Sequence, residues 1–201
     1  CQMAVRAGEA IAEDEISAGA DLLIIGDMGI GNTTPAAALV AATFGLPAGE
    51  VVGRGTGVDD DRLRHKTQVI ATALDRIGER AVDPLQRLAA LGSADIAAGV
   101  GFLRAAARNG VPVLLDGVVS VAEACVAEDL EPGVVAWCAA GHRSTEPAQR
   151  LALEKLGLEP ILDLALRLGE GSGALTALPV LRSAVLMLRE LALLADLIPA
   201  S

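Results

Sequence analysis

The feature of the sequence that most constrains its fold is a repeated order of apolar run, glycine-containing loop and helical pattern. Short runs rich in Leu, Ile and Val predict buried strands at residues 21–26, 111–115 and 134–139. A loop with glycine follows each run, and a helical pattern follows each loop. Repeated strand–loop–helix units predict an α/β fold, with a Rossmann-like parallel sheet and helices on both faces.

Apolar residues at helical spacing predict the helices around this sheet. After the first loop, Thr34 suits the N-cap and Pro35 the first helical position. The other helices are predicted at residues 4–18, 61–79, 94–108, 119–128 and 174–197, with one more from about residue 146. Residues 161–168 fit either a helix or a strand, because Asp163 and Arg167 interrupt an apolar run.

The composition fits one main domain over residues 1–201. Hydrophobic residues make up 52% of the chain and aromatic residues only 1%, so Ala, Leu, Val and Ile must build the core. Alanine favours helices, whereas valine and isoleucine favour strands, as a mixed α/β protein requires. A chain of this length can bury a sizeable core in a single domain.

The charge of the chain disfavours a nucleic-acid ligand. The formal net charge is −10, and lysine occurs only at Lys66 and Lys155, so no basic face is visible. An acidic protein can still bind an anion locally, through backbone N–H groups and a few cations. We therefore expect a small phosphorylated ligand and no nucleic acid.

The cysteines and the apolar segments predict a cytoplasmic protein without a membrane span. Cys1, Cys125 and Cys138 are too widely spaced for a disulfide framework or a metal pair, so we expect core positions in a reducing cytoplasm. The uncharged run from residue 28 to 49 contains polar residues, prolines and glycines, which argue against a spanning helix. No signal peptide is visible, and no metal site is expected.

Ligands of parallel sheets bind beyond the carboxyl ends of the strands, so the loops there are the candidate sites. In the first loop, glycines allow a close approach of the backbone, and the following helix offers free N–H groups to a phosphate. The candidates in this loop are Gly29, Gly31, Asn32 and Thr33. A strand–helix turn that binds nothing is an equally good interpretation of such a loop.

Three further candidates have both a structural and a functional interpretation. Lys66 follows a glycine-rich loop on a helix that Asp59 is predicted to cap; it is either solvated or a phosphate partner. Asp95 and Asp116 fit acceptors for ribose hydroxyl groups, but they also fit a helix cap or an Asx turn. The residues alone leave these alternatives open.

The last two loops supply a second anion site and a base. Ser144 or Thr145 is expected to cap a helix whose N–H groups suit an anion, and capping alone is the simpler interpretation. Glu170 lies between glycines, which let a ligand approach its carboxylate, and Leu168 offers an apolar wall. Desolvation there would raise the pKa of Glu170 and make it a general base near neutrality. An exposed acidic loop is the alternative.

Read together, five stretches of this sequence resemble nicotinate-nucleotide–dimethylbenzimidazole phosphoribosyltransferases. They are GDMGIGNTTPAAAL at 26–39, VGRGTGVDD at 52–60, VPVLLDG at 111–117, HRSTEP at 142–147 and LRLGEGSGA at 166–174. The resemblance runs from about residue 21 to the end of the chain. The order of the five stretches makes it specific, although each stretch alone is weak.

The resemblance implies an activity and a set of site residues. Nicotinate mononucleotide would give its phosphoribosyl group to 5,6-dimethylbenzimidazole, without a cofactor or metal, in a homodimer that contributes to cobalamin lower-ligand assembly. Glu170 would be the general base, and Met28 and Leu168 would lie in the base pocket. The residues expected at the nucleotide and its phosphate are Asp27, Gly29, Gly31, Asn32, Thr33, Lys66, Asp95, Asp116, Gly117, Ser144, Thr145 and Arg167.

Two departures from the family pattern keep alternatives open. The family typically has Glu at the position of Asp27, whose side chain is one methylene shorter and reaches less far. Family members also have a longer N-terminal part, which helps to form the base pocket and subunit contacts. A truncated relative that binds nucleotide without catalysis is therefore one alternative. A transferase for another aromatic base is a second alternative.

Overall fold

The computed structural model describes residues 1–192 except residues 56 and 58. Its elements, in chain order, are α1 (Gln2–Ser17), β1 (Leu23–Ile25), α2 (Thr33–Phe44), α3 (Ala48–Val51), α4 (Asp60–Ile77), the 3₁₀ helix η1 (Gly78–Ala81), α5 (Pro84–Leu91), α6 (Ala94–Arg108), β2 (Val113–Leu115), α7 (Val118–Leu130), the 3₁₀ helix η2 (Val135–Trp137), β3 (Cys138–Ser144), α8 (Pro147–Leu156), β4 (Pro160–Leu166) and α9 (Ser172–Glu190).

The four described strands form one parallel sheet in the order β1-β2-β3-β4. Ile24 pairs with Leu114, and Leu114 pairs with Ala139, so the short strands β1 and β2 align with the start of β3. Because the strands are parallel, all of their carboxyl ends meet at one edge. The loops that follow residues 25, 115, 144 and 166 therefore gather at this edge.

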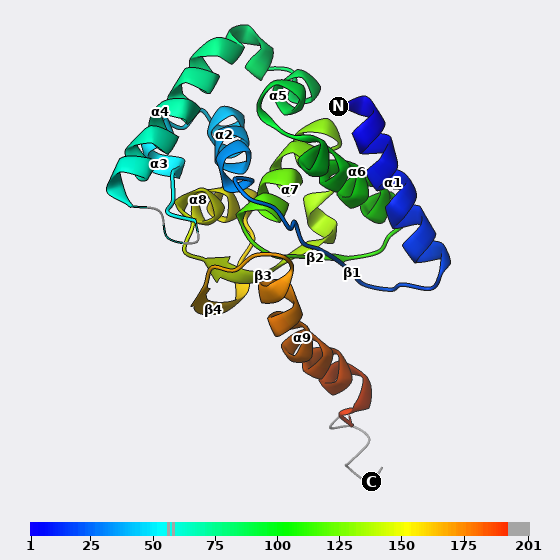
Figure 1. Cartoon of the computed structure of the whole chain (residues 1–201). Helices are drawn as coiled ribbons and strands as arrows, with labels where there is room; N and C mark the ends of the chain where they lie inside the picture. Colours follow the sequence, from blue (N-terminus) through cyan, green and yellow to red (C-terminus); the bar gives the residue numbers. More distant parts are fainter. Residues whose placement is uncertain (56, 58, 193–201) are drawn as a thin grey trace, which may run out of the picture.

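Helices lie on both faces of the sheet, as expected, but they are distributed unevenly. In Figure 1, helices α1 to α8 lie on one side of the strands, and α9 leaves from the other side and projects away. Ala174 and Ala177 of α9 are fully buried and pack with Leu114. The far face of the sheet is thus covered by the first turns of α9.

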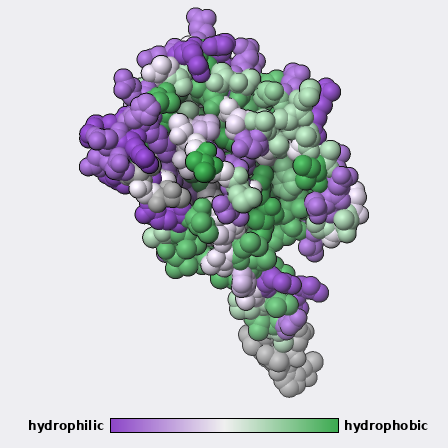
Figure 2. Space-filling view, viewed as in Figure 1, coloured by the Kyte–Doolittle hydropathy of each residue, from purple (hydrophilic) through white to green (hydrophobic). Residues whose placement is uncertain are grey.

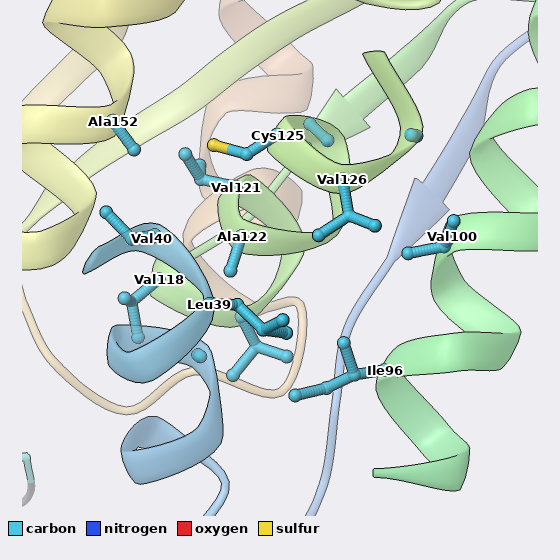
Figure 3. Close-up of a cluster of buried hydrophobic side chains, with 14 of the residues drawn as sticks. Leu39, Val40, Ile96, Val100, Val118, Val121, Ala122, Cys125, Val126 and Ala152 are labelled. Atoms are coloured by element: carbon cyan, nitrogen blue, oxygen red, sulfur yellow. The ribbon is translucent and has the colours of Figure 1, made fainter. Parts of the chain in front are cut away.

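The main core is built around α7, whose residues 118–127 are all buried. In Figure 3, apolar side chains of α2, α6 and α8 converge on Val121, Ala122 and Cys125 of this helix. Alanine makes up much of this contact, since residues 36–38 and 41 of α2 are alanines with at most 3% exposure. Small side chains let the helix axes approach closely, which compensates for the shortage of aromatic residues.

The predicted helices are confirmed, with small shifts at their ends. Asp59 caps α4 as expected, because its carboxylate accepts a hydrogen bond from the backbone N–H of Arg62 at 2.8 Å. The cap expected at Thr34 is wrong, since α2 begins at Thr33 and Asn32 occupies the N-cap position. Residues 161–168, left open between helix and strand, fall largely in β4. The last helix ends at Glu190, before the predicted end at 197, and residues 193–197 lie outside the described residues.

The strand predicted at 134–139 is wrong in position. Residues 135–137 form a 3₁₀ helix, because the Glu128 carboxylate accepts hydrogen bonds from the N–H groups of Gly133 and Val135, at 2.9 and 2.8 Å. The strand itself runs over Cys138–Ser144 and includes Gly141, which was expected in a loop. A Cβ at Gly141 would lie 2.8 Å from Ala174 Cα, so this glycine allows α9 to approach the sheet.

Helix α1 is held to α6 by close backbone packing between glycines. A Cβ at Gly8 would overlap the carbonyl of Ala98, and a Cβ at Gly101 would overlap the carbonyl of Val5. At the rim of this contact, Glu9 accepts hydrogen bonds from two α6 arginines. The sequence positions of these glycines therefore determine where α1 docks.

We predict that Gly8→Ala destabilises the fold. The added methyl group would force the two helices apart at a cost of about 1–3 kcal/mol, more than the gain of up to about 1 kcal/mol in helix propensity. Urea unfolding measures the change. Gly49→Ala in α3 is the control, since no atom lies within 4 Å of its added methyl group. Equal unfolding midpoints for Gly8→Ala and the unmodified protein would contradict the close packing.

Candidate active site

A cavity of about 290 Å³ lies at the carboxyl edge of the sheet, between the loops that follow the four strands. Most of the residues singled out from the sequence line it. They are Asp27, Gly29, Gly31, Asn32, Thr33, Asp116, Gly117, Ser144, Arg167, Leu168 and Glu170. The fold thus brings together segments that lie far apart in the sequence.

Asp116 is the structural centre of this site. It follows β2, is 3% exposed, and accepts hydrogen bonds from the N–H groups of Gly171, Gly173 and Ala174 at 3.1, 2.8 and 3.0 Å. Burial opposes its ionisation, but His142 and the N–H groups of Ala174 and Gly171 outweigh that effect and lower the pKa of Asp116. The carboxylate therefore anchors the loop before α9 and the first turn of that helix.

This anchored loop carries Glu170 in an unusual backbone conformation. Gly169, Glu170 and Gly171 have φ angles of +82°, +60° and +81°, and for glutamate the left-handed region is unfavourable. Gly26 makes room for the turn, because a Cβ there would overlap the peptide between Glu170 and Gly171. Such strain persists where surrounding contacts enforce it, and it is frequent at functional sites.

His142 and Gln149 are buried polar residues at the site that were not proposed from the sequence. His142 is 1% exposed, lines the cavity, and has its Nε2 3.5 Å from Asp116 Oδ1. Gln149 of α8 is fully buried; its amide donates to the carbonyls of Asp116 and His142, and its oxygen accepts from Ser144 N–H. Gln149 thereby fixes the ends of β2 and β3 relative to each other. A helical glutamine gives no sequence signal for this role.

Asp27 lies in the first loop, where its carboxylate accepts a hydrogen bond from the Asn32 amide at 3.0 Å. Burial raises its pKa, the bond from Asn32 lowers it, and the charge of Asp95 raises it further. Asp95 itself is exposed at the start of α6 and lies outside the cavity lining. It acts on the site through its charge rather than by lining it.

Two basic residues, Lys66 and Arg167, lie near the opposite end of the cavity. Lys66 Nζ donates to Thr33 Oγ1 at 2.9 Å and to the carbonyl of Gly53 at 3.2 Å. Burial lowers the pKa of Lys66, and the charge of Glu146 partly restores it. Arg167 donates to the carbonyl of Gly55 at 2.9 Å. Lys66 therefore lies directly behind the lining residue Thr33.

Several details differ from the sequence-based expectations. Asp116 has a further role that the sequence did not predict, because its carboxylate anchors the start of α9, another segment of the chain. The caps expected at Ser144 and Thr145 are wrong, since Glu146 occupies the N-cap of α8. Thr145 borders a separate hollow on the outer side of this loop.

The end of the cavity beside Glu170 is more open than expected. Glu170 is exposed, so the desolvation predicted for its carboxylate is not found in the described chain. Leu168 and Met28 are 65% and 81% exposed, and Met28 does not line the cavity. The apolar wall expected beside Glu170 thus faces outward.

Among the described residues, no cluster of three or more His, Cys, Asp or Glu side chains is arranged to hold a metal ion. None of the described helices combines the length and the apolar character that a membrane span requires.

We predict that Asp116→Asn loosens the loop that carries Glu170. An amide cannot accept all three N–H bonds, and leaving a buried donor unpaired costs about 1–3 kcal/mol. Hydrogen exchange should accelerate at residues 171, 173 and 174. Because the pKa of Asp116 is lowered in the fold, its contribution is complete above its ordinary value of 3.8 and is lost as the pH falls through the folded-state pKa.

Asp163→Asn is the control for this change, because Asp163 is 65% exposed in its side chain and pairs only loosely with Arg143 at 3.6 Å. Unchanged exchange in Asp116→Asn would contradict the anchoring role.

The chain is similar to known proteins over nearly its whole length. A family model described as phosphoribosyltransferase matches residues 1–197. The nicotinate-nucleotide–dimethylbenzimidazole phosphoribosyltransferase of Mycobacterium ulcerans (strain Agy99) is 53% identical over 193 residues, which cover 96% of this chain and 54% of that protein. The protein of the same name from Mycobacterium tuberculosis is 53% identical over 94% of this chain and 52% of its own length.

Solved structures agree with the sequence matches. The crystal structure of CobT from Thermus thermophilus superposes with a TM-score of 0.90 at 47% identity, and the match covers 94% of this chain and 56% of that one. The chain thus spans about half the length of the curated relatives that it matches. Because the family model and relatives at 53% identity cover nearly all of it, the chain belongs to the nicotinate-nucleotide–dimethylbenzimidazole phosphoribosyltransferase family.

Proposed function

We propose that this protein transfers the phosphoribosyl group of nicotinate mononucleotide to 5,6-dimethylbenzimidazole, a step of cobalamin lower-ligand assembly. The products are α-ribazole 5′-phosphate and nicotinate. The observation that carries the proposal is that a helix N-terminus suited to phosphate and Glu170 line the same cavity. The family relationship and the names of the relatives support the same reaction.

The phosphate is assigned to the end of the cavity formed by Thr33, Ser144 and Arg167. The N-terminus of α2 opens there, and its free N–H groups and dipole favour an anion. Lys66 adds charge from behind Thr33. A ribose bound next to this phosphate would extend along the cavity toward Glu170.

The chemistry assigned to Glu170 is general base catalysis. Its carboxylate takes the proton from one benzimidazole nitrogen, and the other nitrogen attacks the anomeric carbon of the ribose. The bond from this carbon to nicotinate breaks, and its electron pair neutralises the pyridinium ring. Attack opposite the leaving group inverts the configuration and gives the α product. Holding the two reactants in line is the main task of the protein.

The exposed surroundings of Glu170 indicate that the reaction requires a further segment to cover this end of the cavity. Ile30 and Leu168 line the cavity with exposed side chains, and Met28, in the same loop as Ile30, is exposed as well. Relatives are about twice as long as this chain. We propose that their additional segment, or a partner subunit, packs here and excludes water from Glu170, which would strengthen it as a base.

We also propose a homodimer in the cytoplasm. The part of α9 that projects from the body carries exposed apolar residues, among them Leu175, Val180 and Met187. Figure 2 shows hydrophobic surface around the start of this projection. Burial of such a face in a subunit contact would explain its composition. Three free cysteines suit a reducing compartment.

The principal alternative is a relative that binds nucleotide without transfer. The openness around Glu170 and the short side chain of Asp27 favour it. Incubation with nicotinate mononucleotide and a panel of aromatic bases, followed by mass spectrometry, separates the two. An α-linked riboside phosphate supports the transferase, and its preferred base identifies the acceptor. Nucleotide binding without any product would support the alternative.

We predict that Glu170→Gln abolishes most of the transfer but not nucleotide binding. General bases contribute about 10²–10⁴-fold, so turnover should fall by at least about 100-fold, while the dissociation constant for nicotinate mononucleotide changes little. Glu50→Gln, an exposed change in α3, should match the unmodified protein. Unaltered turnover in Glu170→Gln would show that the base is another group.

A further inference from the structure

A buried carboxylate occupies the end of the cavity assigned to phosphate. Glu146 is 6% exposed and lines the cavity together with Thr33, Ser144 and Arg167. An anion beside an anion site should weaken binding by repulsion. We therefore expect its contacts to show a role that offsets this repulsion.

The contacts of Glu146 connect three separate segments. Its Oε1 accepts a hydrogen bond from Gly55 N–H at 2.7 Å, 91 positions away in the sequence. Its carboxylate also occupies the space of a Cβ at Gly53, so only glycine fits there. Arg167 holds the carbonyl of Gly55 on the other side. The Gly55 residue is thus fixed from both directions.

The second oxygen of Glu146 faces Lys66, with Oε2 and Nζ 4.0 Å apart and both side chains about 90% buried. Among the described residues, this oxygen has no hydrogen-bond partner. A buried ammonium group is stable only beside a compensating charge, which Glu146 supplies. It therefore keeps Lys66 charged and directed at Thr33.

Lys66 influences the cavity through this threonine. Because Lys66 donates to Thr33 Oγ1, the hydroxyl proton of Thr33 remains free to be donated to another acceptor. A charge-assisted chain of this kind makes the hydroxyl group a better donor to a phosphate. Lys66 thus supports the anion without lining the cavity itself.

We propose that Glu146 is a positioning residue for phosphate recognition, which holds the segment 53–55 in place and sets Lys66 behind Thr33. This inference rests on the proposed function. It makes a counter-intuitive prediction, since removal of a negative charge next to the phosphate should weaken binding. A carboxylate that merely repels the ligand would give the opposite result.

The experiment measures the affinity of Glu146→Gln for nicotinate mononucleotide and for nicotinate riboside, which lacks the phosphate, by titration calorimetry. Glutamine can still accept from Gly55 N–H, but it cannot neutralise Lys66. We expect mononucleotide affinity to fall at least tenfold, with riboside affinity unchanged. Glu146→Asp, which keeps the charge, should recover part of the loss. Glu159→Gln, an exposed change beyond the far end of α8, controls for net charge.

Tighter or unchanged mononucleotide binding by Glu146→Gln would overturn the proposal, and so would an equal loss for both ligands. Hydrogen exchange of Glu146→Ala gives a readout without nucleotide: residues 53 and 55 should exchange faster, and unchanged exchange would also overturn it. If the unmodified protein binds neither ligand, the proposed function fails, and the exchange result still decides whether Glu146 holds the segment.

Discussion

The site depends on one buried carboxylate that accepts hydrogen bonds from three backbone N–H groups of a segment distant in the sequence. Asp116 lies at the end of β2, and the loop before α9 follows more than 50 residues later. Asp116 fixes the residues that follow Glu170, whose φ of +60° is a conformation that glutamate disfavours. The sheet thus helps to set the position of the proposed base through the side chain of Asp116.

At the opposite end of the cavity, a second buried carboxylate also holds a segment that is distant in the sequence. Glu146 connects to Gly55 and Lys66, as Asp116 connects to the Glu170 loop. Gln149 joins the two systems, since its side-chain amide donates to the carbonyl of Asp116 and its backbone N–H donates to the carbonyl of Glu146. Buried polar networks of this kind are costly unless they are well satisfied, and when satisfied they define a single geometry. Glycines at 26, 53, 141 and 173 provide the space that these connections require.

Much of the fold could be predicted from the sequence, because apolar runs and helical spacing are local signals. The strand β3 was misplaced because Gly141 looks like a loop residue, and only its contact with Ala174 explains a glycine inside the strand. Glycine-rich loops at strand ends identified part of the cavity lining, including Glu170, and the family resemblance added Arg167. His142, Glu146 and Gln149 were missed as site residues, because their roles depend on partners that are distant in the sequence.

The central claim is that one cavity holds the nucleotide with its phosphate at the N-terminus of α2 and its reacting carbon toward Glu170. A crystal structure of the protein with nicotinate mononucleotide tests this claim most directly. We expect phosphate oxygens within hydrogen-bond distance of Thr33 or Ser144, and the anomeric carbon on the side of the cavity that Glu170 borders. A nucleotide bound in the reverse direction, or outside this cavity, would contradict it.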